Sequence, residues 1–415
     1  MSKHKRKGSQ LKSQKVALAH SRNEFINHLK QFCDKVTGNL EIFKLISAFD
    51  LEVLFMSRYR PIRVRAAANY KLQSSLQKHC QGYVTSLLKY RKVPFVVGEL
   101  TEVSLFDYYS IVFTVGNYAK KLVLDNEPAT EVLAKALAPV TAKIDGEENK
   151  EPWLQLHNTM NSVVLLFCRM DENIFTAKCE TSTAVGDAGF IIEVYGLETE
   201  KAQINVDGKV RPAHRVGWNN WVPNLRMDYA DIKTEDIGLM PGLKLQAYIQ
   251  NHAIDRLYER MDGMNEGCLS YGIYDSLKNL KVCHNKKGDL LIEYKLFGVK
   301  TGYLIADVVE GQILLRTFLF LTNNGTPEGE RLHKNTGIMK EDKIYLAIDK
   351  MSTFFNSDIA TTPRVKQIFI DAGCESLFKV NKWAYFGKAN QNQQHLSELV
   401  SNYLNLEGEN KVDNS

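Results

Sequence analysis

The sequence predicts an α+β fold, with mainly helical regions at both ends of the chain and strands between them. Three observations lead to this class. Apolar residues recur at helical spacing before residue 170, apolar runs typical of strands occupy much of residues 189–322, and helical spacing returns after residue 331. A chain of 415 residues is long enough for several domains. We expect a disordered basic tail at 1–15, a mainly helical domain at 16–150, a mixed α/β segment at 151–240, an α+β module at 241–330, C-terminal helices at 331–406 and a disordered end at 407–415.

Helices account for most of the predicted N-terminal domain. The segments FINHLKQF (25–32) and LEIFKLISAFDLEVLFMSRY (40–59) repeat apolar residues at helical spacing, and Phe49 and Val53 belong to the apolar set of the second segment. A third helix is expected at 71–90. A short strand is expected to follow it.

The central segment changes from helix to strand. Residues 153–170 have helical spacing, whereas 189–198 is rich in residues that favour strands. The dipeptide Asp207-Gly208 lies between alternating apolar flanks and predicts a β-hairpin within 201–212.

The module at 241–330 combines one helix with a meander. A strand is expected at 243–249 and a helix from His252 to Met261. Short connections then predict antiparallel pairing of three apolar runs, at 290–297, 302–309 and 312–322. The last run is apolar on both sides, as a strand at the centre of a covered sheet would be.

Two helices are expected in the C-terminal region. Apolar residues from Ile344 to Phe355 predict one continuous helix. Thr362 and Pro363 predict the start of a second helix, and Gly373 suits its end.

The net charge of +5 belongs to the start of the chain. The sequence has 53 Lys and Arg against 48 Asp and Glu. Six of these cations lie in residues 1–15, which contain no acid, so subtracting them leaves residues 16–415 at −1. A neutral body argues against a protein that coats nucleic acid with its whole surface, while a local basic groove stays possible.

Several classes of protein are not expected from this composition. No apolar run is long enough for a membrane span, and no apolar segment follows the basic start as in a secretion signal, so we expect a cytoplasmic protein without membrane contact. The seven cysteines are scattered without a C-x-x-C pair, which predicts buried reduced thiols. We find no metal site, no cofactor motif and no motif for sequence-specific DNA binding.

The segment NHAIDRLYER (251–260) is the strongest candidate for chemistry. On a helix, His252, Arg256 and Arg260 form one stripe, and Glu259 lies near the same side. Imidazole can transfer a proton near neutral pH, and guanidinium binds phosphate and the charge that develops on it. RNA carries its own nucleophile, the 2′-hydroxyl, so this set suits RNA cleavage without a metal. The alternative is an ordinary solvated helix face with paired charges.

The pattern H-A-x-x-R-x-x-E-R, followed by a strand meander, resembles toxin-like ribonuclease domains of the barnase–colicin–RelE fold type over residues 243–325. The resemblance implies a bacterial, metal-independent endoribonuclease or an RNA-binding relative. It implies that His252 acts as general acid or base, that Arg256 stabilises the phosphate, that Glu259 orients one of them and that Arg260 steers RNA. Such domains also place a polar residue on a late strand.

The candidates for that late-strand position are Arg316, Thr317 and Thr322, and we expect Arg316 to contact nucleic acid. Strict alternation along a strand predicts that Arg316 and Thr317 do not face the same side of the sheet.

A second basic segment lies in the N-terminal domain. SRYRPIRVR (57–65) contains Arg58, Arg60, Arg63 and Arg65, and alternation would place Arg63 and Arg65 on one strand face. The four arginines either grip an RNA backbone or form a solvated edge paired with acids.

A different class of function is the alternative to an RNA enzyme. The neutral body and the large apolar helices also suit a non-catalytic interaction or scaffold protein, whose partner would be another protein.

Overall fold

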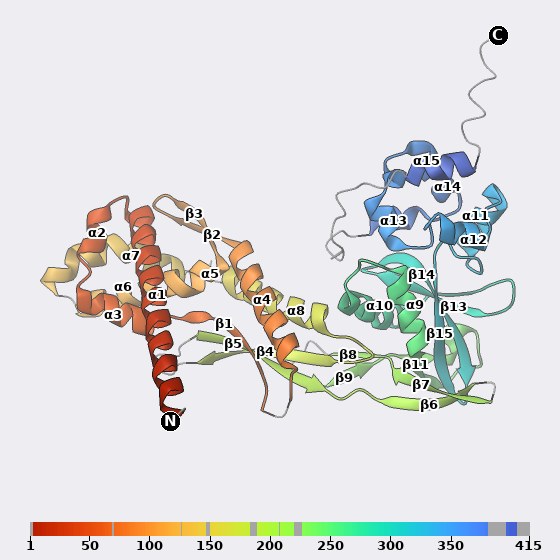
Figure 1. Cartoon of the computed structure of the whole chain (residues 1–415), viewed down its shortest axis with the longest axis horizontal. Helices are drawn as coiled ribbons and strands as arrows, with labels where there is room; N and C mark the ends of the chain where they lie inside the picture. The colour runs from red at the N-terminus through yellow and green to blue at the C-terminus, as the bar shows by residue number, and fades with distance from the viewer. Residues whose placement is uncertain are drawn as a thin grey trace, which may run out of the picture. The chain divides into compact units, whose positions relative to one another are not determined.

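The computed structural model describes residues 3–68, 70–125, 127–146, 150–182, 189–206, 208–219, 226–380 and 396–404. The chain divides into two compact units: unit 1 comprises residues 1–164 and 177–195, and unit 2 comprises 165–176 and 196–415. Both contain helices and strands, which confirms the α+β class (Figure 1). Within the described residues, no helix is both long and apolar enough to cross a membrane.

Unit 1 is mainly helical. Its larger helices are α1 (Lys3–Thr37), α2 (Leu40–Lys44), α3 (Ala48–Ser57), α4 (Ser74–Tyr90), α6 (Phe113–Asp125), α7 (Glu131–Asp145) and most of α8 (Lys150–Phe167). The structure therefore has a helix from Lys3 where the sequence predicted a disordered tail at 1–15. The helix predicted at 40–59 is two helices, because Ser47 caps a new start by accepting a hydrogen bond from the Asp50 amide.

A three-stranded sheet accompanies these helices, in the order β1 (Arg60–Ala66), β5 (Gly189–Leu197), β4 (Ile174–Ser182). Strand β1 is an edge strand, parallel to β5. Helix α4 covers the free backbone edge of β1: the Gln81 amide bonds to the Val64 N–H and the Ile62 carbonyl, and Gln77 donates to the Val64 carbonyl. These amide groups close an edge that would otherwise be open to another strand.

Unit 2 is built on one eight-stranded sheet. The order is β12-β13-β14-β15-β11-β7-β6, with β10 paired to β11. The strands are β6 (Lys201–Val206), β7 (Lys209–Arg215), β10 (Asp231–Lys233), β11 (Lys244–Gln250), β12 (Val282–His284), β13 (Leu290–Leu296), β14 (Val299–Val309) and β15 (Gln312–Phe320).

The sequence predicted much of this sheet. Strands β13, β14 and β15 form the expected antiparallel meander, and β6 and β7 form the expected hairpin, of which Asp207 lies outside the described residues. Strand β15 lies between β14 and β11, which confirms its central place. The boundary expected at residue 240 instead falls inside this sheet, because β11 pairs with β7 as well as with β15.

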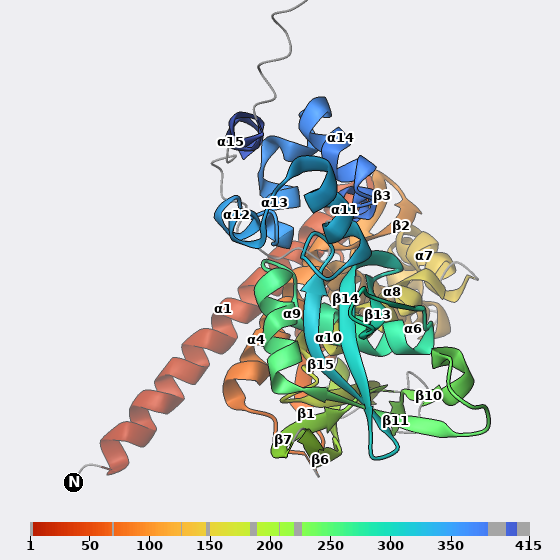
Figure 2. The same cartoon turned by 90° about the vertical axis from the view of Figure 1, so that its right-hand side faces the viewer.

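Two helices cover one face of the sheet. In α9 (Asn251–Arg260), Asn251 hydrogen-bonds the ring of His214 on β7. In α10 (Glu266–Lys278), the Leu269 carbonyl accepts a hydrogen bond from the Tyr294 hydroxyl on β13. The strand register places Tyr294 and His214 on the same side, which we call the helix-covered face. We call the opposite side the open face; in Figure 2, β14 and β15 lie in front of α10 on this side. Part of it is covered, because Leu314 and Tyr248 are buried there together with Ile204 of β6 and Ala213 of β7.

Glycine allows the close contact between α10 and the sheet. A Cβ atom on Gly272 would lie 2.6 Å from the Tyr294 hydroxyl oxygen and 3.1 Å from the Lys295 carbonyl oxygen. Any larger residue would push α10 away from β13.

Short helices complete unit 2: α11 (Pro327–Thr336), α12 (Lys340–Tyr345), α13 (Met351–Asn356), α14 (Pro363–Asp371) and α15 (Leu396–Tyr403). Helix α14 begins after Thr362 and is followed by Gly373 at φ +86°, as predicted. The single helix predicted from Ile344 to Phe355 is wrong. The backbone turns at Ala347, which has φ +51°, and α13 starts afresh.

A lysine is buried among these short helices. The Lys343 side chain is 2% exposed, and its ammonium group donates to the Asn324 side chain and, at 3.0 Å, to the Gly329 carbonyl. Burial lowers the pKa of Lys343 to about 8, although the charge of Glu330 opposes this.

We predict that wild-type stability rises with pH relative to the variant Lys343→Met. Below pH 8 the lysine is charged in both states, and the folded state carries the full cost of burying that charge. As the pH rises from 8 towards the unfolded pKa, the folded amine loses its proton first and the cost disappears. The difference in unfolding free energy should change by about 2 kcal/mol in favour of wild type between about pH 7 and 9.5.

Urea unfolding at both pH values measures this difference. Lys340→Met removes an exposed lysine from the same helix and serves as the matched control. A Lys343→Met variant with the same pH dependence as this control would contradict the prediction.

Candidate functional site

The predicted helix α9 forms, but its polar residues do not act as one group. Ala253, Ile254 and Leu257 pack towards the sheet, which leaves His252, Arg256 and Glu259 on the outer side. Arg256 is paired with Glu259 at 2.5 Å, so its charge is largely neutralised. His252 is exposed. This outer side therefore holds one accessible imidazole and one surface ion pair.

Arg260 does not join this stripe, because it forms an ion pair with Asp349. The two side chains are only 12% and 3% exposed. The next turn adds a second link to the same region, since Asp262 accepts hydrogen bonds from the Ser352 amide and hydroxyl at 2.9 and 2.7 Å. The expected RNA-steering arginine therefore fastens α9 to the C-terminal helices.

The arginines of residues 58–65 belong to unit 1 and are also largely engaged. The Arg58 guanidinium lies 3.7 Å from the centre of the Phe55 ring, and burial, with the nearby charge of Arg60, lowers its pKa. Arg63 and Arg65 share one face of β1, as alternation predicted, opposite the buried Ile62 and Val64.

Arg65 forms an ion pair with Glu193 on the neighbouring strand at 3.0 Å. It therefore follows the second of the two expectations for this segment, a charged strand face paired with acids.

Arg316 and Thr317 face the same side of the sheet, so the prediction that alternation separates them is wrong. The register of β14 and β15 shifts here: Ile305 lies opposite Thr317, but Ala306 lies opposite Leu315, which leaves Arg316 as the extra residue of a β-bulge. Arg316 binds Asp307 on β14 at 2.7 Å.

Apolar burial explains the bulge. Ile313 and Leu315 face the helix-covered side, and so does Phe318, whose ring packs against Tyr294 at 5.4 Å. Leu315 and Phe318 are three positions apart, so a regular strand would place them on opposite faces. The extra residue lets both be buried, and it turns Arg316 and Thr317 to the open face.

Arg316 lies beside a pocket. The guanidinium also approaches Asp289 at 3.6 Å, and Asp289 and Asp307 both line a cavity of about 540 Å³. This volume lies in the range of small-ligand sites. The remaining lining residues are Asn205, Val206, Ile237, Leu239, His284, Lys287, Gly288, Leu290, Ala306, Val308 and Val309. The pocket thus combines apolar walls with a histidine, a lysine and two carboxylates.

A tight turn positions Asp289 and His284 at this pocket. Asn285 accepts hydrogen bonds from the amides of Lys287 and Asp289, and its side-chain amide donates to the Asp289 carboxylate at 2.8 Å. Gly288, at φ +85°, allows the chain to return into β13. Asn285 thus holds both the backbone and the carboxylate of Asp289, which keeps this carboxylate in place 3.6 Å from Arg316.

The two groups of predicted residues lie on opposite sides of the sheet. Helix α9 covers one face with its polar side turned outward, whereas Arg316 points from the other face. One phosphate group cannot contact both. The sequence did not lead us to expect His284, Asp289 or Asp307 at a functional site. The H-N-K-K-G-D turn of a hairpin was the available signal.

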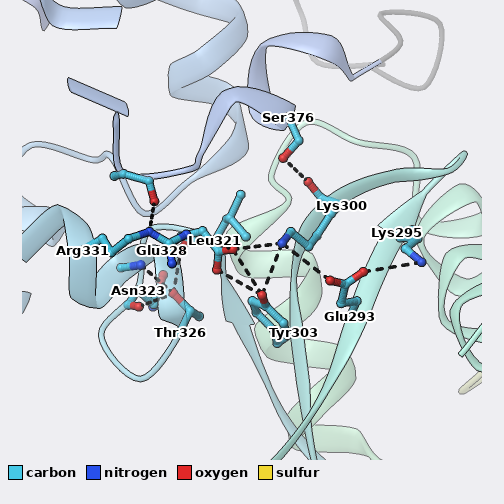
Figure 3. Close-up of polar contacts among 12 residues, drawn as sticks. Glu293, Lys295, Lys300, Tyr303, Leu321, Asn323, Thr326, Glu328, Arg331 and Ser376 are labelled. Atoms are coloured by element: carbon cyan, nitrogen blue, oxygen red, sulfur yellow. Dashed lines mark hydrogen bonds and ion pairs between the residues drawn. The ribbon is translucent and has the colours of Figure 1, made fainter. Parts of the chain in front are cut away.

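A buried polar network lies further along the open face (Figure 3). Glu328, only 5% exposed, accepts hydrogen bonds from Lys300 at 2.9 Å and from the Tyr303 hydroxyl at 3.1 Å. Lys300 also lies 3.6 Å from Glu293, and Glu293 lies 3.5 Å from Lys295. Burial disfavours the Lys300 charge, but the two carboxylates outweigh it and raise its pKa.

Other candidates have structural roles. The Thr322 hydroxyl is buried and donates to the Ile348 carbonyl at 2.7 Å. Within the described part of the chain, no group of three His, Cys, Asp or Glu side chains is arranged to hold a metal ion. Comparison of the chain with protein-family models, curated protein sequences and solved structures finds no match.

We predict that Arg260→Ala strongly destabilises unit 2, whereas Arg256→Ala does not. Removing Arg260 leaves the Asp349 carboxylate buried without its cation, which should cost about 3–5 kcal/mol. Arg256 belongs to an exposed pair on the same helix, so its removal should change the unfolding free energy by less than about 0.5 kcal/mol. Urea unfolding of both variants measures the contrast, and equal stabilities would contradict it.

Proposed function

We propose that unit 2 binds RNA on the open face and cleaves it without a metal at the pocket beside Arg316. The observation that carries the proposal is the β-bulge, which brings a guanidinium, two carboxylates and a pocket with His284 and Lys287 together. The resemblance of residues 243–325 to toxin-like ribonuclease domains gives the same reaction class, although the proposed residues differ from those it implied on α9.

The reaction needs a base, an acid and a stabilising charge. In the proposed step, the Asp307 carboxylate accepts the proton of a 2′-hydroxyl, whose oxygen attacks the adjacent phosphorus. Arg316 binds the phosphate oxygens as negative charge develops on them. Lys287 on the turn at the pocket, in its charged form, gives a proton to the departing 5′-oxygen. The products are a 2′,3′-cyclic phosphate and a 5′-hydroxyl end.

Charge limits how tightly the pocket holds RNA. Arg316 faces two carboxylates, so the three groups together carry one negative charge, and Lys287 at the pocket restores neutrality. A phosphate must therefore compete with Asp289 and Asp307 for the guanidinium. We therefore expect weak binding at the pocket, with the small salt dependence of a single phosphate contact.

Cleavage of single-stranded RNA in EDTA tests the proposal. Wild-type protein should produce ends with 2′,3′-cyclic phosphate, and Lys287→Ala and Arg316→Ala should each lower the rate by about 100-fold or more. His252→Ala is the control, because it removes the exposed histidine of α9 on the other side of the sheet. It should leave the rate unchanged.

Two outcomes would contradict the proposal. Absence of both cleavage and RNA binding by the wild type would remove the function itself. Loss of cleavage in His252→Ala but not in Arg316→Ala would move the site to α9.

A second candidate function, contact with another protein, is favoured by an observation in unit 1. Phe49, Val53 and Met56 follow one another at helical spacing along α3, and all three are exposed, Phe49 by 74%. The sequence grouped Phe49 and Val53 with the apolar face of a helix, but neither is buried. An exposed apolar stripe of this kind is typical of an interface.

A second copy of the chain is the partner to test first, because twofold homodimers are the commonest protein oligomers. We predict that the wild type self-associates in sedimentation velocity runs and that the double variant Phe49→Asp, Met56→Asp stays monomeric. Tyr90→Asp, at an exposed aromatic residue of α4, is the control and should associate like the wild type. A wild type that is monomeric throughout the accessible concentration range would contradict the prediction.

A further inference from the structure

We infer that the open face takes RNA as an extended single strand rather than as one nucleotide, with a second phosphate contact at Lys295. The inference rests on the proposed function, because it assigns the substrate class of the same face. It joins two features that lie far apart on the sheet, the Arg316 pocket and the Glu328 network.

Both features lie on the open face. Glu293 lies opposite Tyr303 in the pairing of β13 and β14, and Tyr303, Ile305 and Asp307 alternate along β14 on that side. Tyr303 belongs to the Glu328 network and Asp307 to the Arg316 pair. Four strand residues span about 13 Å, and the two phosphate contacts, Lys295 and Arg316, lie further apart because they are on the two strands that flank β14.

This separation exceeds a single nucleotide. Successive nucleotides advance about 3.4 Å along the axis in a stacked strand and further in an extended strand, so about 13 Å corresponds to about two to four of them. A ligand that contacts both ends must therefore be an oligonucleotide.

The surface between the two ends suits unpaired bases. Ile305, Thr317 and Leu319 are partly exposed there, and they offer mainly apolar atoms between two charged groups. Single strands bind by placing bases on apolar or aromatic surfaces while cations follow the phosphates. A duplex keeps its bases stacked inside and would not use this strip.

Lys295 is the cation that can turn to a phosphate at the far end. Lys300 is held at 2.9 Å by the buried Glu328 carboxylate, so releasing it would leave that carboxylate without its cation. Lys295 has a looser contact, 3.5 Å to Glu293, and 15% of its side chain is exposed. Glu293 also lies 3.6 Å from Lys300, so this carboxylate has a second cation if Lys295 turns away.

The charges of the network also favour a phosphate. Lys295, Lys300 and Arg331 face only two carboxylates, Glu293 and Glu328, which leaves one positive charge in excess. The far end of the open face therefore attracts an anion more strongly than the pocket does.

The test compares two probes, adenosine 5′-monophosphate and a fluorescent single-stranded RNA octamer, with wild type and Lys295→Ala. The variant should bind the octamer about 5- to 10-fold more weakly and lower the salt slope by about 0.7, as expected for one lost phosphate contact on a single strand. Wild type should bind the octamer more tightly than the mononucleotide, because only the octamer reaches both ends of the open face. Lys295→Arg should restore octamer binding, and Lys244→Ala, at an exposed lysine on β11, should behave as wild type.

The outcomes separate this inference from the proposed function. Octamer binding that needs Arg316 but is the same in Lys295→Ala and wild type would overturn the inference and leave the function standing. An octamer that binds no more tightly than the mononucleotide would overturn it as well. A wild type that binds neither probe would overturn both. Unchanged thermal unfolding of Lys295→Ala shows that any loss does not come from misfolding.

Discussion

The buried carboxylate of Glu328 is the constraint on which the arrangement of unit 2 depends. It lies in the first turn of α11, where the helix dipole favours a negative charge, and it needs Lys300 and Tyr303 from β14 as partners. A buried carboxylate without partners would cost several kcal/mol, so separating α11 from β14 is unfavourable. The C-terminal helices are thereby fixed to one end of the open face, and at the other end the Arg316 side chain stays 34% exposed.

The ion pair of Arg260 with Asp349 attaches the C-terminal helices to the other side of the sheet. Their ion pair, with the hydrogen bonds of Asp262 to Ser352, ties α9 to the start of α13. Two buried charged contacts thus attach the C-terminal helices to both faces of the sheet. The domain boundary predicted near residue 330 therefore lies within unit 2. One of these contacts uses Arg260, which the sequence pattern of α9 assigned to RNA binding.

Local periodicity was enough to predict the meander, α9 and α14, because alternation and helical spacing report which side of an element is apolar. It could not predict the partners of the charged residues. Arg260 and Arg256 look equivalent on one helix, yet only Arg260 meets a buried acid, and that acid comes from a distant part of the chain. Nor could it show that Ala347 breaks a helix, because the turn depends on contacts such as the Thr353 hydroxyl with the Ala347 carbonyl.

The bulge at Arg316 shows how packing can create a site. Ile313, Leu315, Phe318 and Phe320 cannot all face one side of a regular strand, and each large apolar residue left exposed would cost about 1.5–3 kcal/mol. One extra residue lets all four face α9 and α10. The extra residue of the bulge turns to the open face beside Asp307, and the Asp307 carboxylate stabilises an arginine at this position. The position of the guanidinium therefore follows from burial on the opposite face, and a substrate on the open face meets a group that the core has already placed.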